Sequence, residues 1–166
     1  MKEINIKELN LNPFELQNTW ALLSAKDENE YNAMTVSWGS FGILWEKPTA
    51  TLYIRPERYT KKLLDKNDYY TISFFDKEYK KDLGILGTIS KNTDPNKMEK
   101  VSLTKEEKDN IVYFKEAKLV LICKKIYVNQ INKDGIKDKI IIDKMYPNND
   151  YSYSYIGEIE KVLVKE

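Results

Sequence analysis

Short runs of β-branched and aromatic residues recur along this chain, and their close spacing limits the folds that it can adopt. About six such runs are separated by polar turns, few segments between them have a helical pattern, and no internal repeat is present. The pattern predicts a mainly β protein, a closed or nearly closed β-barrel with a few short helical insertions. The predicted strands are residues 20–25, 31–38, 49–54, 68–75, 117–128 and 155–164.

Several of the connecting segments also carry local signals. The charged residues 27–30 predict a turn that pairs the first two strands as a hairpin. Residues 39–42, with two glycines, are expected to loosen the backbone. Residues 78–86 fit a short helix, and the capping-box pattern of residues 102–107 predicts the start of another.

The overall composition is that of an ordinary globular domain. A chain of 166 residues is expected to form one domain, residues 1–166, that buries a sizeable core. The net charge of +1 gives no field that would favour nucleic acid or an anionic membrane as a partner. No apolar run approaches membrane-spanning length and the N-terminus lacks a signal-peptide core, so we expect a cytoplasmic location.

Histidine is absent, which restricts the chemistry available to the chain. The absence excludes histidine-activated nucleophiles, histidine metal sites and the usual general base near neutral pH. Cys123 is the only cysteine, and its place in an apolar run predicts a small buried side chain rather than a redox thiol. We find no paired-carboxylate catalytic site and predict no metal site. Any redox chemistry would then come from a bound cofactor.

Arginine occurs only twice among 27 basic residues, at Arg55 and Arg58. A guanidinium can bind a phosphate or carboxylate through two parallel hydrogen bonds. The pair follows a predicted strand and precedes a short predicted helix beginning at Tyr59 and Thr60, with Pro56 suited to its first position. A helix N-terminus with such side chains is a plausible anion site. A solvated turn, in which Arg58 pairs with a nearby acid, is an equally plausible interpretation.

Aromatic residues gather in two further segments. Trp38, Phe41 and Trp45 lie near a glycine-flanked loop and predict an aromatic cluster in the core or at a dimer interface. Tyrosines alternate over residues 151–155, which favours an exposed ladder at a dimer contact over a ligand-facing site.

Six blocks of this chain resemble the flavin reductase-like family, in the branch that includes flavoredoxin. They are residues 32–39, 53–60, 69–75, 79–84, 116–121 and 155–159, in family order over nearly the whole chain. The resemblance implies a Greek-key split β-barrel that binds FMN, a homodimer with the flavin near the subunit interface, and a redox function. Two segments depart from the family pattern: residues 90–93 lack its Gly-Arg pair, and residues 151–155 lack its histidine.

The resemblance also assigns candidate cofactor-binding residues. It implies that the segment 32–38 borders the isoalloxazine ring and that four residues of the arginine turn hold the ribityl phosphate. From sequence alone, Met34, Val36 and Trp38 share one strand face and could equally be core residues. Lys91 could neutralise negative charge on the reduced flavin, or simply be a solvated lysine. The full set is Asn32, Met34, Thr35, Val36, Ser37, Trp38, Arg55, Arg58, Tyr59, Thr60 and Lys91.

These inferences lead to three functional hypotheses. The first is an FMN-binding, NAD(P)H-dependent flavin reductase that passes electrons through bound FMN to free flavin or another acceptor. No dinucleotide fingerprint is present, so NAD(P)H would dock only transiently. The second is a flavoredoxin-like electron carrier with a protein redox partner. The third is a barrel that binds a ligand other than flavin.

Overall fold

The computed structural model describes residues 1–166, and a single antiparallel sheet dominates it. The strand order is β3-β2-β6-β9-β10-β5-β4, with β1 paired to β10, and β7-β8 forms a separate hairpin. The strands are β1 (Lys2–Ile4), β2 (Ala21–Lys26), β3 (Tyr31–Val36), β4 (Gly39–Leu44), β5 (Lys47–Ile54), β6 (Tyr69–Phe74), β7 (Lys105–Lys108), β8 (Ile111–Phe114), β9 (Leu119–Gln130) and β10 (Tyr153–Val164).

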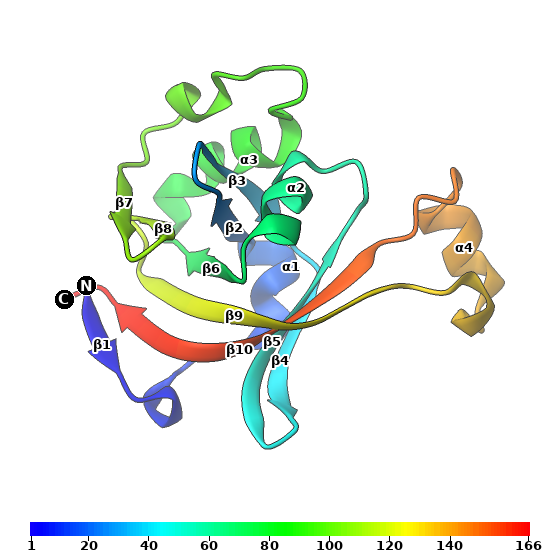
Figure 1. Cartoon of the computed structure of the whole chain (residues 1–166), viewed down its shortest axis with the longest axis horizontal. Helices are drawn as coiled ribbons and strands as arrows, with labels where there is room; N and C mark the ends of the chain where they lie inside the picture. Colours follow the sequence, from blue (N-terminus) through cyan, green and yellow to red (C-terminus); the bar gives the residue numbers. More distant parts are fainter.

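Short helices connect the strands. In Figure 1, α3 lies beside β2 and β3, and α4 lies at the end of an arm that continues from β9 and β10, away from the barrel. No helix is long and apolar enough to cross a membrane. The α-helices are α1 (Leu16–Thr19), α2 (Tyr59–Lys66), α3 (Lys80–Thr88) and α4 (Lys139–Met145); the 3₁₀ helices are η1 (Ile6–Glu8), η2 (Pro13–Glu15), η3 (Lys77–Tyr79), η4 (Lys97–Lys100) and η5 (Lys133–Gly135).

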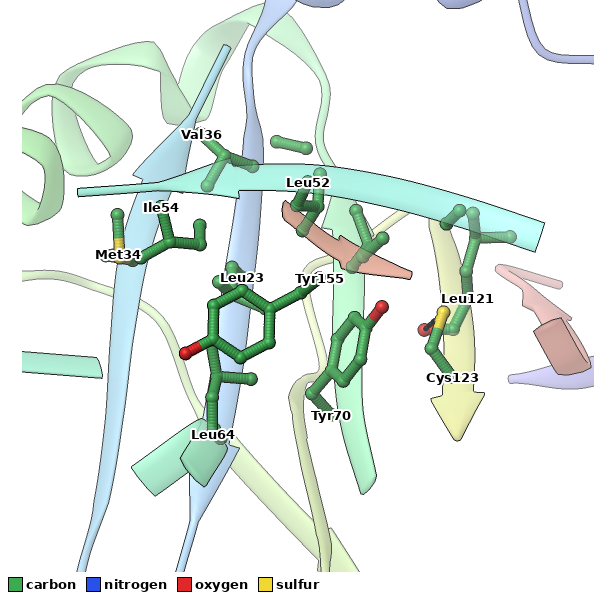
Figure 2. Close-up of a cluster of buried hydrophobic side chains, with 14 of the residues drawn as sticks. Leu23, Met34, Val36, Leu52, Ile54, Leu64, Tyr70, Leu121, Cys123 and Tyr155 are labelled. Atoms are coloured by element: carbon green, nitrogen blue, oxygen red, sulfur yellow. Dashed lines mark hydrogen bonds between the residues drawn. The ribbon is translucent and has the colours of Figure 1, made fainter. Parts of the chain in front are cut away.

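Part of the sheet is buried on both faces, which explains the nearly continuous apolar runs in its sequence. Along β9, Leu121 and Cys123 point into the main core, whereas Val120 and Ile122 pack in a second cluster that also contains Leu83 of α3. Figure 2 shows Cys123 in the main core, where burial raises the pKa of its thiol. The prediction of a small buried side chain at this position is confirmed.

Three local predictions were wrong, two of them because a hairpin turn was not recognised. Residues 39–42 belong to β4, and residues 105–108 form β7 rather than the start of a helix. The turns are Trp45-Glu46 and Asp109-Asn110, each with positive φ at both residues, as type I′ hairpin turns require. Pro56 lies in a turn, and α2 begins after it, at Tyr59.

Neither the predicted aromatic cluster nor the predicted tyrosine ladder forms within the chain. Phe41 packs on Phe74, but Trp45 packs on Tyr127, so Phe41 and Trp45 belong to separate contacts. The tyrosines of residues 151–155 form no exposed ladder, because Tyr151 and Tyr155 are buried and Tyr153 is half-buried. Figure 2 shows Tyr155 inside the core, and its hydroxyl donates a hydrogen bond to Asp65 at 2.6 Å.

Candidate functional site

The start of α2 supplies one side of a small polar cavity. Arg58 precedes the helix in an extended conformation and has no side-chain cap. The backbone N–H groups of Tyr59 and Thr60 donate to no backbone carbonyl, as expected in the first turn of a helix. Thr60 is buried, and its hydroxyl accepts a hydrogen bond from Asn32 Nδ2 at 3.0 Å.

Strand β3 and the segment after α3 supply the rest of the cavity, whose volume is about 10 Å³. Six of the residues predicted to bind the cofactor come together here, from three separate segments of the chain. The lining residues are Asn32, Met34, Arg58, Tyr59, Thr60, Ile89, Ser90, Lys91 and Lys97.

Three of the lining side chains are cations, and only Lys91 pairs with a carboxylate, that of Glu30. The Arg58 guanidinium donates to the carbonyl of Gly87 at 3.1 Å. Lys97 is 1% exposed and donates to the carbonyls of Ala33 and Leu86 at 3.0 and 3.1 Å. The cavity therefore carries an excess of positive charge.

This excess charge affects the protonation of Lys97. Burial, together with repulsion from Arg58 and Lys91, lowers the pKa of Lys97 to about 8. Burial also lowers the pKa of Arg58. An anion in the cavity would offset these costs by pairing with the cations.

The donors around the cavity have the chemistry that a phosphate group such as that of FMN requires, but the cavity as it stands has room for about one water, so the side chains at its rim must move outward to admit a phosphate. The donors include a guanidinium, two ammonium groups, hydroxyls and the free N–H groups of a helix N-terminus, which is the donor set that phosphates favour. One lining group stands apart, because the buried Asn32 Oδ1 has no hydrogen-bond partner and can only accept. A ligand hydroxyl near the phosphate would satisfy this acceptor.

Three of the other predicted residues point away from this cavity. Thr35 faces α3, where its hydroxyl donates to the carbonyl of Leu83, and Val36 is buried in the main core. Arg55 donates to Asp150 and to the carbonyl of Met145. The structure therefore does not bring the two arginines together as one anion-binding pair.

Ser37 and Trp38 instead line an apolar groove of about 570 Å³ at the end of β3. Trp38 is 39% exposed, and the Arg55 guanidinium lies 5.8 Å from its ring centroid. The segment before α1 and the arm with α4 complete the groove. Its lining residues are Pro13, Phe14, Leu16, Gln17, Ser37, Trp38, Gly39, Tyr53, Ile131, Ile141 and Tyr146.

Sequence reasoning missed Glu30 and Lys97 as members of this site. Glu30 lies in a charged turn and Lys97 in a polar loop, where neither residue type stands out. Only the folded chain shows that Lys97 is buried and that Glu30 reaches Lys91. One weak sequence signal was available, because Lys97 lies shortly after Lys91 in the same polar stretch.

The solved structures that are similar to this chain agree on one fold. No family model and no curated protein matches the chain. Among solved structures, flavoredoxin from Methanosarcina acetivorans is 17% identical, with a TM-score of 0.71 over 96% of this chain and 75% of that one. An FMN-binding domain of a flavin reductase-like enzyme from Shewanella baltica is 15% identical, with a TM-score of 0.70 over 97% and 75%.

A third similar structure is described as a split barrel. It is a candidate flavin reductase with a split barrel domain from Shewanella frigidimarina, 19% identical, with a TM-score of 0.69 over 89% of this chain and 67% of that one. The predicted mainly β fold with short helical insertions is confirmed. The chain has the split-barrel fold that it shares with flavoredoxin and with FMN-binding flavin reductase-like proteins.

Proposed function

We propose that residues 1–166 form one FMN-binding domain of an oxidoreductase, with the FMN phosphate in the cation-lined cavity at the start of α2. The observation that carries this proposal is the excess of positive charge around that cavity, where Arg58 and Lys97 have only carbonyl acceptors. A phosphate would give both cations a partner of opposite charge. The shared fold with FMN-binding proteins supports the same assignment.

Strand β3 connects this cavity with the apolar groove. Met34 lines the cavity, whereas Ser37 and Trp38, farther along the chain, line the groove. We propose that the cavity holds the phosphate and that the groove end of β3 borders the isoalloxazine ring. Trp38 would then exclude water from the ring, and the Ser37 hydroxyl would offer it a hydrogen bond.

The redox chemistry would come from the cofactor. FMN, when bound, would supply hydride and electron transfer between NAD(P)H and free flavin or another acceptor. The chain contributes binding and orientation, since it has no histidine and its one thiol is buried. A flavoredoxin-like electron carrier is the second candidate, favoured by the likeness to flavoredoxin.

Two measurements test this function. The purified protein, titrated with FMN, should show the shifted visible absorption spectrum of a bound flavin. The protein with bound FMN should then oxidise NADH or NADPH faster in the steady state when additional free flavin is present as an acceptor than when it is absent. A bound flavin without NAD(P)H oxidation would favour the electron carrier, and a spectrum unchanged by the protein would leave a barrel that binds another ligand.

Arg58 provides a direct test of the phosphate site. Arg58→Ala should weaken FMN binding by about 1.5 kcal/mol, roughly tenfold, because a charge-assisted hydrogen bond to the phosphate is lost. Arg58→Lys should also lose affinity, since the ammonium lacks the planar fork. Isothermal titration would measure both variants. Parent-like affinity in both would place the phosphate elsewhere.

We also propose that two copies of the chain pair across the apolar groove. Phe14 at its edge is 89% exposed, and Ile140 and Ile141 of α4 are 71% and 45% exposed, which is unusual for large apolar side chains on a lone domain. A two-fold pairing would bury the same patch on both subunits. It would also close the groove beside Trp38.

Phe14→Glu tests this assembly. A buried carboxylate without a partner is costly, so the variant should be a monomer at concentrations where the parent is a dimer. Light scattering would give both masses. Lys7→Glu, an exposed change of greater charge in the same segment, should leave the dimer intact. A monomeric parent that binds FMN fully would contradict the pairing.

A further inference from the structure

Glu30 occupies the rim of the cation-lined cavity from the turn between β2 and β3. Its carboxylate accepts a hydrogen bond from the Tyr59 hydroxyl at 2.5 Å and forms an ion pair with Lys91. Tyr59 and Lys91 both line the cavity, whereas Glu30 does not. One carboxylate thus engages two of the donors that would face a phosphate.

The protonation states of these groups keep the contact in place at neutral pH. Hydrogen bonds from Lys91 and then from Tyr59 lower the pKa of Glu30, so its carboxylate is ionised. The hydrogen bond to Glu30 raises the pKa of Tyr59 to about 12, so its hydroxyl keeps its proton. The contact is therefore an anion held by a cation and a neutral donor.

We propose that Glu30 is an internal competitor for the phosphate of the flavin, and that it makes FMN an exchangeable ligand of this chain. The inference rests on the proposed function and adds a regulator to that site. Before the phosphate can use the Tyr59 hydroxyl, that single donor must leave Glu30, and the Lys91 ammonium must share its charge between the carboxylate and the phosphate. The Glu30 carboxylate then stands near a second anion, which repels it.

The geometry allows this exchange without rearrangement of the sheet. The Glu30 side chain is 31% exposed and that of Lys91 is 16% exposed, so the carboxylate can turn to solvent once the pair opens. Lys91 also donates to the carbonyl of Tyr31 at 3.1 Å, which keeps its ammonium at the cavity rim. Arg58 and Lys97 have no carboxylate partner and remain available to the phosphate throughout.

Glu30→Gln tests the competition because it removes the charge and keeps the shape and the acceptor oxygen. FMN should bind about tenfold more tightly to this variant, the size of one relieved repulsion near the protein surface. Riboflavin, which has the same ring and no phosphate, should bind with unchanged affinity. Quenching of flavin fluorescence measures both ligands, and thermal unfolding confirms that the variant is folded.

Glu28→Gln is the matched control, because Glu28 lies in the same turn, is exposed and makes no hydrogen bond to the chain. It should change FMN affinity less than twofold, since an exposed charge is screened. If Glu30→Gln does not fold, Glu30→Ala takes its place with the same expected direction. Added salt should reduce the gain in affinity.

The possible outcomes separate the two proposals. FMN binding to the parent with no gain, or a loss, in the Glu30 variants overturns the competition and leaves the FMN site standing. An equal gain for riboflavin also overturns it, because the effect would then be one of shape. Absence of FMN binding in the parent and in the variants overturns both proposals.

Discussion

Gly157→Ala is expected to lower the free energy of unfolding by about 3 kcal/mol, because the core offers no room for one more methyl group. A Cβ at Gly157 would overlap the hydroxyl of Tyr70, lie 2.8 Å from its Cζ and lie 3.0 Å from Cys123 Cβ. Tyr70 is itself 2% exposed, and Figure 2 shows it enclosed by other core side chains. Its ring can move only by displacing them.

The backbone at Gly157 is also held on both sides. It pairs with Ala50 of β5 and with Lys125 of β9, at the point where the register with β9 shifts. Strand β10 therefore cannot retreat from Tyr70 without losing ladder hydrogen bonds. Urea denaturation of the variant and the parent gives the difference in free energy of unfolding.

Two variants serve as controls for the Gly157 prediction. Gly42→Ala places a methyl group on another strand with nothing within 4 Å, so stability should hardly change. Tyr70→Phe removes a buried hydroxyl that has no hydrogen-bond partner, so it should cost little alone. Combined with Gly157→Ala, it should recover part of the loss. Parent-like stability of Gly157→Ala would contradict the rigid packing inferred here.

Most strands could be predicted from sequence where a long apolar run forms them, but the short apolar run of β8 (Ile111–Phe114) was missed. The hairpin of β2 and β3 was predicted because residues 27–30 are plainly polar, and β9 because its apolar run is long. Strands β4 and β7 were not, since Trp45-Glu46 is an unusual pair for a turn that requires positive φ, and β7 is entirely exposed. Four β7 residues bury nothing, so no hydrophobic period marks them.

The candidate site could be predicted only in part, for a physical reason. Arg58, Tyr59 and Thr60 are adjacent in sequence, so a local signal places them together. Lys97 reaches the same cavity only because the segment after α3 folds back on β3, where its ammonium meets the carbonyl of Ala33. Contacts of this kind depend on the path of a loop, which residue types alone do not encode.

Lys97→Met is expected to weaken FMN binding by about 3 kcal/mol, because a buried ammonium that faces the phosphate is lost. Methionine has a similar length and fills the same space, so the packing should be kept. The variant relieves the burial of a charge but leaves the carbonyls of Ala33 and Leu86 without this donor. These effects on stability oppose each other, so affinity should fall far more than the free energy of unfolding.

Lys100→Met is the matched control for Lys97, because Lys100 belongs to the same 3₁₀ helix, is half-exposed and pairs with Asp94 at the surface. Removal of a surface ion pair costs little, so FMN affinity should stay within twofold of the parent value. Titration calorimetry and urea denaturation, run on both variants, separate a binding role from a structural one. Equal losses of affinity in the two variants would exclude a direct contact between Lys97 and the phosphate.

The pH profile of FMN binding should identify Lys97 independently of the mutations. The pKa of Lys97 is lowered from 10.5 to about 8 in the folded protein without FMN. Between pH 8 and pH 10.5 the unfolded chain therefore binds one proton more than the folded protein does, and the free energy of unfolding without FMN rises with pH in this range. A phosphate beside Lys97 requires the protonated form. FMN affinity should therefore fall above pH 8, by up to about tenfold per pH unit, and Lys97→Met should abolish that slope. A parent profile that stays flat from pH 7.5 to about pH 9.5 would mean that the phosphate does not depend on the Lys97 ammonium.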